Sequence, residues 1–362
     1  MAVTGIDELM VKEAFTNLTT REKQVLASLI THYIASADPV GSRVIANKFM
    51  TDLSPATIRN TLQDLEELGL LAQPHTSAGR VPTDSGYRIY VDYLLQPNQL
   101  TQDVKDTIRQ QILKEGRGIN EILGQTCKVL SEITSQLGVS VAPKFDAGIL
   151  KRLELIPISN DRIMAVVVVQ SGLARSVIIE IEAAIPDQLL HDVEQVLNER
   201  LSGLTLGEIR ESISRRLADV SGQGRLISIL IDSKEKIWSE KGSDEIHLAG
   251  ADRLISKPEF ASHEKLSDLL KVLENGQVLT DFLRNQEEEG LVITIGKENR
   301  LVEVMNCSLV TSSYHVGNIK GTVGIIGPTR MPYSQLVSVV EYTARTITEV
   351  LSGLEEKGNG GR

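Results

Sequence analysis

The polar residues best suited to chemistry in this chain lie on one side of a short segment, residues 54–69. Ser54 and Pro55 predict the start of a helix there, because serine caps helix N-termini and proline is favoured at the first helical position. Gly69 predicts its end. At about 100° per residue, the apolar residues of this helix share one side, which we expect to face a core. They are Ile58, Leu62, Leu65 and Leu68.

The opposite side of the same helix carries groups that can read the edges of DNA bases. It consists of Ala56, Asn60, Gln63 and Glu67, with Arg59 at its margin. Asparagine and glutamine can each form two hydrogen bonds with an adenine edge, alanine can touch a thymine methyl group, and arginine can bind guanine or phosphate. This side therefore suits the major groove of duplex DNA. The alternative is that these residues are merely solvated on a surface helix.

A small loop with one arginine, residues 75–80, follows between two short apolar runs. The residues of the loop whose side chains or backbone amides can donate to phosphate are His75, Thr76, Ser77 and Arg80. Pro74 and Pro82 bracket the loop and oppose pairing with further strands. Because an aromatic-rich helix follows at once, the order helix, basic hairpin, helix predicts a winged helix-turn-helix. A plain β-hairpin is the alternative.

Two helices are expected before the helix that begins at Pro55. Thr19 and Glu22 match a capping box, and apolar residues recur at helical spacing over residues 25–34. Residues 38–41 break this helix, and Ser42 is expected to cap a short second helix. These elements complete the three-helix core that a winged helix requires.

The expected DNA contacts come from the second helix, the third helix, the loop and the start of the next helix. The predicted contact residues are Ser42, Arg43, Ser54, Ala56, Thr57, Arg59, Asn60, Gln63, His75, Thr76, Ser77, Arg80 and Arg88. By contrast, Tyr87, Tyr90 and Tyr93 are expected to pack against the rest of the protein, not to stack on bases.

The charge balance limits how such a protein can bind DNA. The chain has a formal net charge of −10, and residues 18–96 carry seven basic against eight acidic side chains, a balance of −1. An acidic body limits non-specific association with nucleic acid. Affinity should then come from a few placed contacts and from two copies of the domain.

Several classes of protein are disfavoured. No run of about 18 apolar residues predicts a membrane span, and the N-terminus does not match a signal peptide. Cys127 and Cys307 show no pairing pattern, which favours a reducing cytosol. Cys307 and His315 lack an orienting acid, so a buried structural cysteine is expected, and residues 317–324 lack phosphate-loop spacing. The histidines have no metal-ligand spacing. We expect a cytoplasmic protein that is not an enzyme and holds neither cofactor nor metal.

At 362 residues the chain is long enough for two or three domains. After a linker at 96–99, a helical stretch is expected at 101–137, interrupted near Gly116 and Gly118. Beyond it we expect strands at 153–158, 163–169, 176–181, 226–231, 291–295, 305–314 and 321–326, and helices at 186–201, 206–217, 266–283 and 334–354. The pattern predicts an α+β body in which central helical material interrupts a run of antiparallel strands.

These motifs together resemble one family, the HrcA-type heat-inducible transcription repressors of bacteria. The matching segments are residues 33–34, 39–42, 53–60, 65–69, 73–83, 86–88 and 324–333. The similarity runs nearly from end to end, and residues 203–264 carry the least recognisable pattern.

The resemblance implies a multidomain α+β architecture. Its expected parts are a winged-helix domain at 1–96, a GAF-like domain at 97–202 and 265–354, an inserted dimerising domain at 203–264, and a flexible tail at 355–362. It also implies a homodimer that binds an inverted-repeat operator upstream of chaperone operons, of the chaperonin and Hsp70 type, and blocks transcription at normal temperature. The chaperonin would maintain its activity.

Two other functions remain open at the level of sequence. A ligand-sensing winged-helix transcription factor would hold a small molecule in the GAF-like domain. A protein-binding winged helix is compatible with the near-neutral charge of residues 18–96.

Overall fold

The computed structural model describes residues 12–114, 118–219, 224–238, 246–284, 289–299 and 301–359. The chain forms two compact units. The first unit consists of Met1–Val141, Ile246–Ser313 and Thr322–Arg345, and the second of Ala142–Glu245, Tyr314–Gly321 and Thr346–Arg362. The second unit therefore interrupts the first in sequence.

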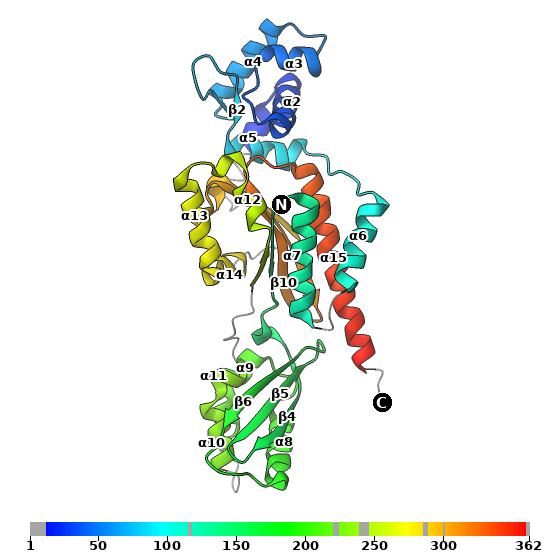
Figure 1. Ribbon diagram of the computed structural model, residues 1–362, viewed down its shortest axis with the longest axis vertical. Helices are drawn as coiled ribbons and strands as arrows, with labels where there is room; N and C mark the ends of the chain where they lie inside the picture. The colour runs from blue at the N-terminus through cyan, green and yellow to red at the C-terminus, as the bar shows by residue number, and fades with distance from the viewer. Residues whose placement is uncertain are drawn as a thin grey trace. The chain divides into compact units, whose positions relative to one another are not determined.

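The N-terminal part of the first unit is a winged helix, as predicted (Figure 1). Its elements are α2 (Thr20–Ser36), α3 (Ser42–Lys48), α4 (Pro55–Glu67), β1 (Leu71–Ala72), β2 (Val81–Pro82), α5 (Asp84–Ile89) and the π-helical turn η1 (Tyr90–Leu94). β1 and β2 pair antiparallel. Buried leucine, isoleucine and valine side chains of α2, α3 and α4 form the core of this part.

Local chemistry explains where these helices begin. Thr19 accepts a hydrogen bond from the Glu22 amide at 3.3 Å, while the Glu22 carboxylate accepts one from the Thr19 amide at 2.6 Å, which confirms the capping box. The Ser54 hydroxyl accepts the Thr57 amide at 3.1 Å. One prediction was wrong: Gly41, not Ser42, is the N-cap of α3. The Gly41 carbonyl already accepts the Val44 amide at 3.0 Å, so Ser42 lies inside the helix.

The rest of the first unit is a five-stranded sheet between two groups of helices. Its strand order is β7-β3-β10-β9-β8. The strands are β3 (Leu137–Val141), β7 (Ile246–Ala249), β8 (Leu291–Ile295), β9 (Cys307–Val316) and β10 (Ile319–Pro328). The helices are α6 (Gln102–Lys114), α7 (Ile119–Thr134), α12 (Ala251–Ile255), α13 (His263–Glu274), α14 (Gly276–Arg284) and α15 (Tyr333–Asn359), of which the part of α15 from Thr346 on belongs to the second unit.

Both faces of this sheet are covered. Figure 1 shows α7 and α15 on one side and α12 to α14 on the other. All five residues of β3 are buried, as expected for a strand with helices on both faces. Leu137, Val139 and Val141 pack in one core with α12 to α14. On the α7 side, the Cys127 thiol donates to Ser140 Oγ at 3.2 Å.

The second unit is a three-stranded antiparallel sheet, β4 (Leu150–Ser159), β5 (Arg162–Val169) and β6 (Ala174–Glu180), with helices on one face. The helices are α8 (Asp187–Leu201), α9 (Leu206–Arg216), α10 (Gly224–Asp232) and α11 (Lys234–Trp238). Alternate residues of β5 are buried, and they share a core with the helices. The other face of the sheet lacks such a cover among the described residues.

Residues 226–231, predicted as a strand, belong to α10 instead. Leu226, Ile227 and Leu230 are buried, and this spacing places them on one face of a helix. The predicted helix 266–283 is two helices, α13 and α14, which meet at Asn275. β3 and β7 were not predicted.

The borders of the inserted part also differ from those expected. The expected insertion covers 203–264, whereas the second unit begins at Ala142 and residues 246–264 return to the first. The physical reason is that β7 pairs with β3, while β4 to β6 pair only with one another. α15 continues to Asn359, so the predicted tail 355–362 is helical as far as it is described, and 360–362 lie outside the described residues. Over the described residues, no helix is long and apolar enough to cross a membrane.

Candidate nucleic-acid interface

Helix α4 separates its residues as the helical wheel predicts, except that Leu68, expected in the core, is the C-cap residue after the helix and is 55% exposed. Ile58, Thr61, Leu62 and Leu65 are buried. The exposed residues on the other side are Ala56, Arg59, Asn60, Gln63 and Glu67. The predicted base-reading side chains therefore share one accessible face, which we call the reading face.

Two predicted contact residues serve first to start this helix. Ser54 is exposed, and its Oγ lies 2.9 Å from the hydroxyl oxygen of the half-buried Thr57. On the reading face, Gln63 Nε2 donates to Glu67 Oε1 at 3.1 Å. This bond orients the Gln63 amide and satisfies one of its donors.

The loop between β1 and β2, the wing, is held by a residue that sequence reasoning missed. Gln73 Nε2 donates to the carbonyl oxygens of Thr76 and Ala78, both at 3.0 Å. His75, Thr76 and Ser77 are exposed. The signal for Gln73 was weak, because a glutamine before a proline has many possible roles.

Arg80 lies at the base of the wing. Its backbone exchanges two hydrogen bonds with Val40, both of 2.9 Å, which attach the wing to the segment before α3. Its Nη2 lies 2.7 Å from Glu66 Oε2 of α4, and the Arg80 side chain is 18% exposed. A Cβ atom on Gly79 would lie 2.4 Å from the Val40 carbonyl carbon. Glycine is therefore required where the wing meets this backbone.

Helix α3 contributes fewer exposed candidate contact residues than α4. Arg43 is exposed and Ser42 is half-buried at the start of α3. Both residues follow closely after Val40, which forms a β-bridge with Arg80 at the base of the wing. α3, α4 and the wing thus form one connected structure, which is the arrangement through which a winged helix contacts phosphates and bases.

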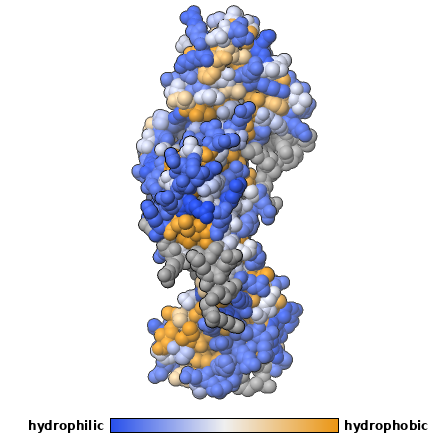
Figure 2. All heavy atoms as spheres, turned by 90° about the vertical axis from the view of Figure 1, so that its right-hand side faces the viewer, coloured by the Kyte–Doolittle hydropathy of each residue, from blue (hydrophilic) through white to orange (hydrophobic). Residues whose placement is uncertain are grey.

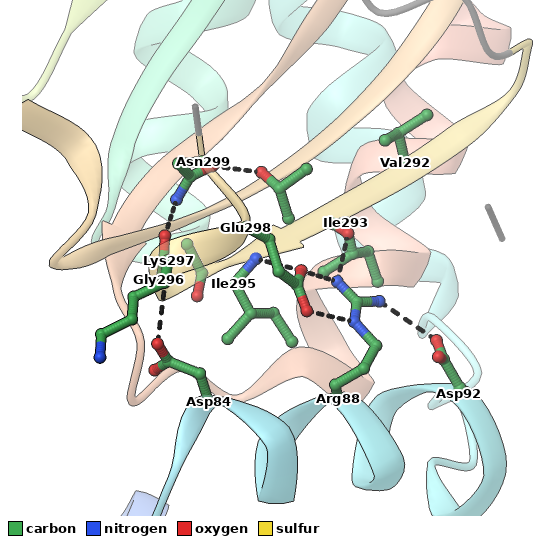
Figure 3. A network of polar contacts seen from close by, with 12 residues as sticks. Asp84, Arg88, Asp92, Val292, Ile293, Ile295, Gly296, Lys297, Glu298 and Asn299 are labelled. Atoms are coloured by element: carbon green, nitrogen blue, oxygen red, sulfur yellow. Dashed lines mark hydrogen bonds and ion pairs between the residues drawn. The ribbon is translucent and has the colours of Figure 1, made fainter. Parts of the chain in front are cut away.

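Arg88 is the predicted contact residue that the structure places elsewhere. It is 2% exposed, and its guanidinium donates to Glu298, Asp92 and the Ile293 carbonyl (Figure 3). Burial by itself would lower the pKa of this guanidinium, but the hydrogen bond to Glu298 and the negative charges of Glu298 and Asp92 raise it overall. Because α5 packs on β8, Arg88 faces the five-stranded sheet, not DNA. The prediction for Arg88 was wrong.

The remaining candidates for chemistry are structural. Cys127 and Cys307 are buried, and burial raises the pKa of each thiol to about 12. Both are therefore protonated and unreactive near neutral pH. Tyr87 is buried, with its ring 5.9 Å from that of Tyr333 in α15, so it packs against the body as expected. Among the described residues, no group of histidine, cysteine and carboxylate side chains could hold a metal ion.

A three-helix core, an exposed polar helix and a hairpin bridged to that core define a winged helix-turn-helix, the DNA-binding module of many transcription regulators. The sequence agrees. Residues 17–92 match the family described as "Winged helix-turn-helix transcription repressor, HrcA DNA-binding", and residues 120–337 match "HrcA protein C terminal domain". The chain belongs to the HrcA family of heat-inducible transcription repressors.

Individual relatives agree with this membership. The chain is 38% identical over 343 residues to the heat-inducible transcription repressor HrcA of Chlorobium chlorochromatii, covering 93% of this chain and 99% of that protein. It is 36% identical to the repressor of the same name from Desulfitobacterium hafniense, covering 92% and 97%. A crystal structure of a hypothetical protein at 2.2 Å resolution is similar in fold, with a TM-score of 0.58 at 22% identity, covering 93% and 100%.

Proposed function

We propose that this repressor binds, as a homodimer in the cytoplasm, to an inverted-repeat operator upstream of chaperonin and Hsp70-type chaperone operons. It blocks their transcription at normal temperature, and the chaperonin maintains its activity. The observation that carries the DNA part of this proposal is the reading face of α4, where Ala56, Arg59, Asn60 and Gln63 are exposed together on the helix that pairs with Arg80 of the wing through Glu66. The operon and chaperonin parts rest on the resemblance to the family.

The proposed operator contacts divide into two kinds. Asn60 and Gln63 read base edges, while Arg43, Arg59, Arg80 and the exposed wing residues contact phosphates. Because the winged helix carries almost equal numbers of acidic and basic residues, one copy makes few phosphate contacts. Two copies on an inverted repeat double these contacts, and two-fold symmetry matches the protein to the DNA.

The outer face of the three-stranded sheet supports the homodimer. Ile156 of β4, Met164 of β5 and Ile178 of β6 lie in one row across this face, because Met164 pairs with both isoleucines. Ile156, Ile158 and Ile178 are exposed, which is unusual for large aliphatic side chains that lie close together on a sheet. Figure 2 shows apolar surface on this unit. We assign the dimerising role to the second unit, and the five-stranded sheet with its helices takes the place of the GAF-like domain.

Fluorescence anisotropy on a labelled inverted-repeat duplex from a chaperonin-operon promoter tests this function. A scrambled duplex is the control, and both are titrated at two salt concentrations, with and without chaperonin. We expect tight binding to the repeat alone, improved by chaperonin, and a fall in log K of about 0.9 per neutralised phosphate for each tenfold rise in salt. Equal weak binding to both duplexes by folded protein would contradict the proposal.

A further inference from the structure

We propose that Arg88 and Arg330 are positioning residues that fix the winged helix in one orientation on the five-stranded sheet. This fixed orientation restricts the spacing of the two half-sites that the repressor accepts, because the winged helix cannot move on the sheet to follow a displaced half-site. The inference rests on the proposed function, since spacing has meaning only for a dimer on an inverted repeat. It goes beyond that function by assigning operator geometry to residues that do not touch DNA.

Arg88 extends from α5 of the winged helix to the five-stranded sheet of the same unit. Its Nε donates to Glu298 Oε1 at 2.8 Å, Nη2 to the Ile293 carbonyl oxygen at 2.6 Å, and Nη1 to Asp92 Oδ1 at 3.2 Å. A second bond joins Nη2 to Glu298 Oε2. Ile293 belongs to β8, and Glu298 to the short turn η4 (Gly296–Glu298) that follows it. The planar guanidinium thus bonds a strand and a turn at once, which limits both sliding and rotation of α5.

The turn that receives Arg88 is itself fixed (Figure 3). Glu298 Oε2 accepts the Ile295 amide at 2.8 Å, and the buried Asn299 side chain donates to the carbonyl oxygens of Gly296, Val304 and Cys307 at 2.8 to 3.1 Å. The Lys297 amide in turn donates to Asp84 Oδ2 of α5 at 3.1 Å. The receiving carboxylate therefore has a defined position before α5 docks.

Gly296 allows α5 to come this close. It has a φ of +57°, and a Cβ atom there would lie 2.3 Å from the Asp84 carboxylate. Any other residue would be strained in this conformation and would push Asp84 away. The contact between α5 and η4 thus depends on backbone shape as well as on charge.

Arg330 makes a second contact in the opposite direction, from the end of β10 to α2 of the winged helix. Its Nη1 donates to the Ile34 carbonyl oxygen at 2.7 Å, and its Nε to Glu259 Oε1 at 2.6 Å. Ile34 lies in the last turn of α2, where carbonyl groups lack partners within the helix. Arg330 follows β10 and Glu259 precedes α13. The rest of the first unit therefore contacts the winged helix at two separate points, α5 and the end of α2.

These contacts are better suited to orientation than to stability. Buried ion pairs contribute little net stability compared with apolar packing, because removing two charges from water is costly, and their best-attested role is to select one arrangement. The linker after η1 is fixed as well, since the Asn98 amide donates to the Ser334 carbonyl oxygen at 2.9 Å. The reading face of α4 stays exposed while these contacts are made. The docked orientation is thus compatible with DNA binding.

The consequence can be measured on operators of different length. If each winged helix is fixed on the five-stranded sheet, movement at this joint cannot adapt the two reading faces of a dimer to a different half-site spacing. Inserting 5 bp between the half-sites turns one of them to the opposite side of the duplex, whereas 10 bp restores the angle but changes the distance. A winged helix on a loose linker would follow the half-site in both cases.

The experiment compares wild-type full-length protein with three variants on duplexes carrying 0, 5 or 10 extra base pairs, and on a single half-site. The variants are Glu298→Gln combined with Arg330→Gln, Gly296→Ala, and Arg88→Lys. Lys271→Ala is the matched control, because it removes an exposed cation of α13 that pairs with Asp268. Thermal unfolding and sedimentation verify that each variant is folded and has the wild-type oligomeric state.

We expect the 5 bp insertion to weaken wild-type and Lys271→Ala binding by more than about tenfold, because the second half-site is lost. We call the loss of affinity that the 5 bp insertion causes the insertion penalty. In the double variant and in Gly296→Ala the insertion penalty falls below about threefold, while affinity for the single half-site changes by less than about twofold. Arg88→Lys keeps the charge but loses the planar fork, so its penalty lies between these values.

Variants with the wild-type penalty would overturn the inference, and so would variants that lose affinity equally on every duplex. Variants that bind the unchanged operator more tightly would also overturn it, because the contacts would then inhibit binding. Failure of the wild-type protein to bind any of the duplexes would contradict the proposed function itself. In wild-type protein, slow hydrogen exchange at the Lys297 amide, faster in Gly296→Ala, shows that the variant opens the contact.

Discussion

Asn60 and Arg59 occupy neighbouring exposed positions on the reading face but have different expected roles. Asn60→Ala should cost roughly 1–3 kcal/mol on the cognate operator and little on random duplex, because a base-edge contact is lost. Arg59→Ala should weaken binding to both the cognate operator and random duplex. It should also reduce the slope of log K against log salt concentration by about 0.9 for each phosphate contact that is lost. Anisotropy titrations on the two duplexes at several salt concentrations measure these effects. Equal losses on both duplexes in Asn60→Ala would make Asn60 a positioning residue.

Arg80 is restrained by Glu66 through an ion pair of 2.7 Å. Glu66→Gln should release the guanidinium towards phosphate, raising operator affinity about two- to fivefold at low salt and steepening the salt slope by about 0.9. Arg80→Ala should weaken binding and leave dimerisation unchanged. Salt titrations of both variants test this pairing.

Asp64→Asn is the matched control, since Asp64 is an exposed acid on the same helix. It removes the same charge without releasing Arg80, so its salt slope should stay at the wild-type value. A slope in Glu66→Gln that equals the slope in Asp64→Asn would show that Arg80 gains no phosphate contact.

Individual residues were predicted well where helical spacing alone decides exposure. The reading face of α4 follows from the period of Ile58, Leu62 and Leu65, because these side chains must enter the core. Arg88 could not be placed this way. Its partner Glu298 is distant in sequence, and an arginine near a wing has the same pattern whether it faces phosphate or a buried carboxylate.

At the scale of elements, Gly79 joins the wing to the rest of the DNA-binding module. Gly79→Ala places a methyl group 2.4 Å from the Val40 carbonyl carbon, so we expect loss of the two bonds between Val40 and Arg80. The loss of these bonds should lower the unfolding temperature of the winged helix. It should also weaken operator binding by about fivefold or more, because phosphate contacts from the wing are lost. Calorimetry and anisotropy measure the two effects.

Gly124→Ala provides the comparison within the same unit. Gly124 lies inside α7, and a Cβ atom there makes only an ordinary contact of 3.6 Å with His247. This substitution should stabilise the protein by about 0.5–1 kcal/mol and leave operator binding unchanged. Normal operator affinity in Gly79→Ala would show that the wing position does not depend on this contact.

Secondary structure was predicted best where the apolar pattern extended over many residues and capping residues marked its ends. α2 and α4 have caps that the sequence displays, and after Arg162 β5 is a run of apolar residues that ends in four valines. Residues 226–231 mislead because five of the six are leucine or isoleucine, and such a short apolar run is shared by strands and buried helices. β3 is short, and its partners β7 and β10 are distant in sequence, so only tertiary pairing reveals it.

At the scale of the whole molecule, the apolar row on the second unit should control assembly. Ile178 is 55% exposed, and Ile178→Asp would place a charge at the centre of the proposed dimer interface. We expect a monomer, with operator affinity reduced by more than about tenfold because only one half-site is occupied at a time. Sedimentation velocity and anisotropy measure both.

Val302→Asp is the matched control, because Val302 is 65% exposed but belongs to the first unit. It should remain dimeric with normal affinity. A dimeric Ile178→Asp protein would place the interface elsewhere, whereas a monomer that keeps full operator affinity would contradict binding as a dimer.

The interrupted order of the first unit also determines when it can be completed during synthesis. Val141 of β3 pairs with Thr322 of β10, so all strands of the three-stranded sheet and helices α8 to α11 are translated between these two partners. Until β10 leaves the ribosome, β3 has an open edge and its apolar residues lack one neighbouring strand. Such long-range pairing closes slowly and exposes aggregation-prone surface. We therefore expect the nascent chain to be most prone to aggregation before residue 328 of β10 has been synthesised.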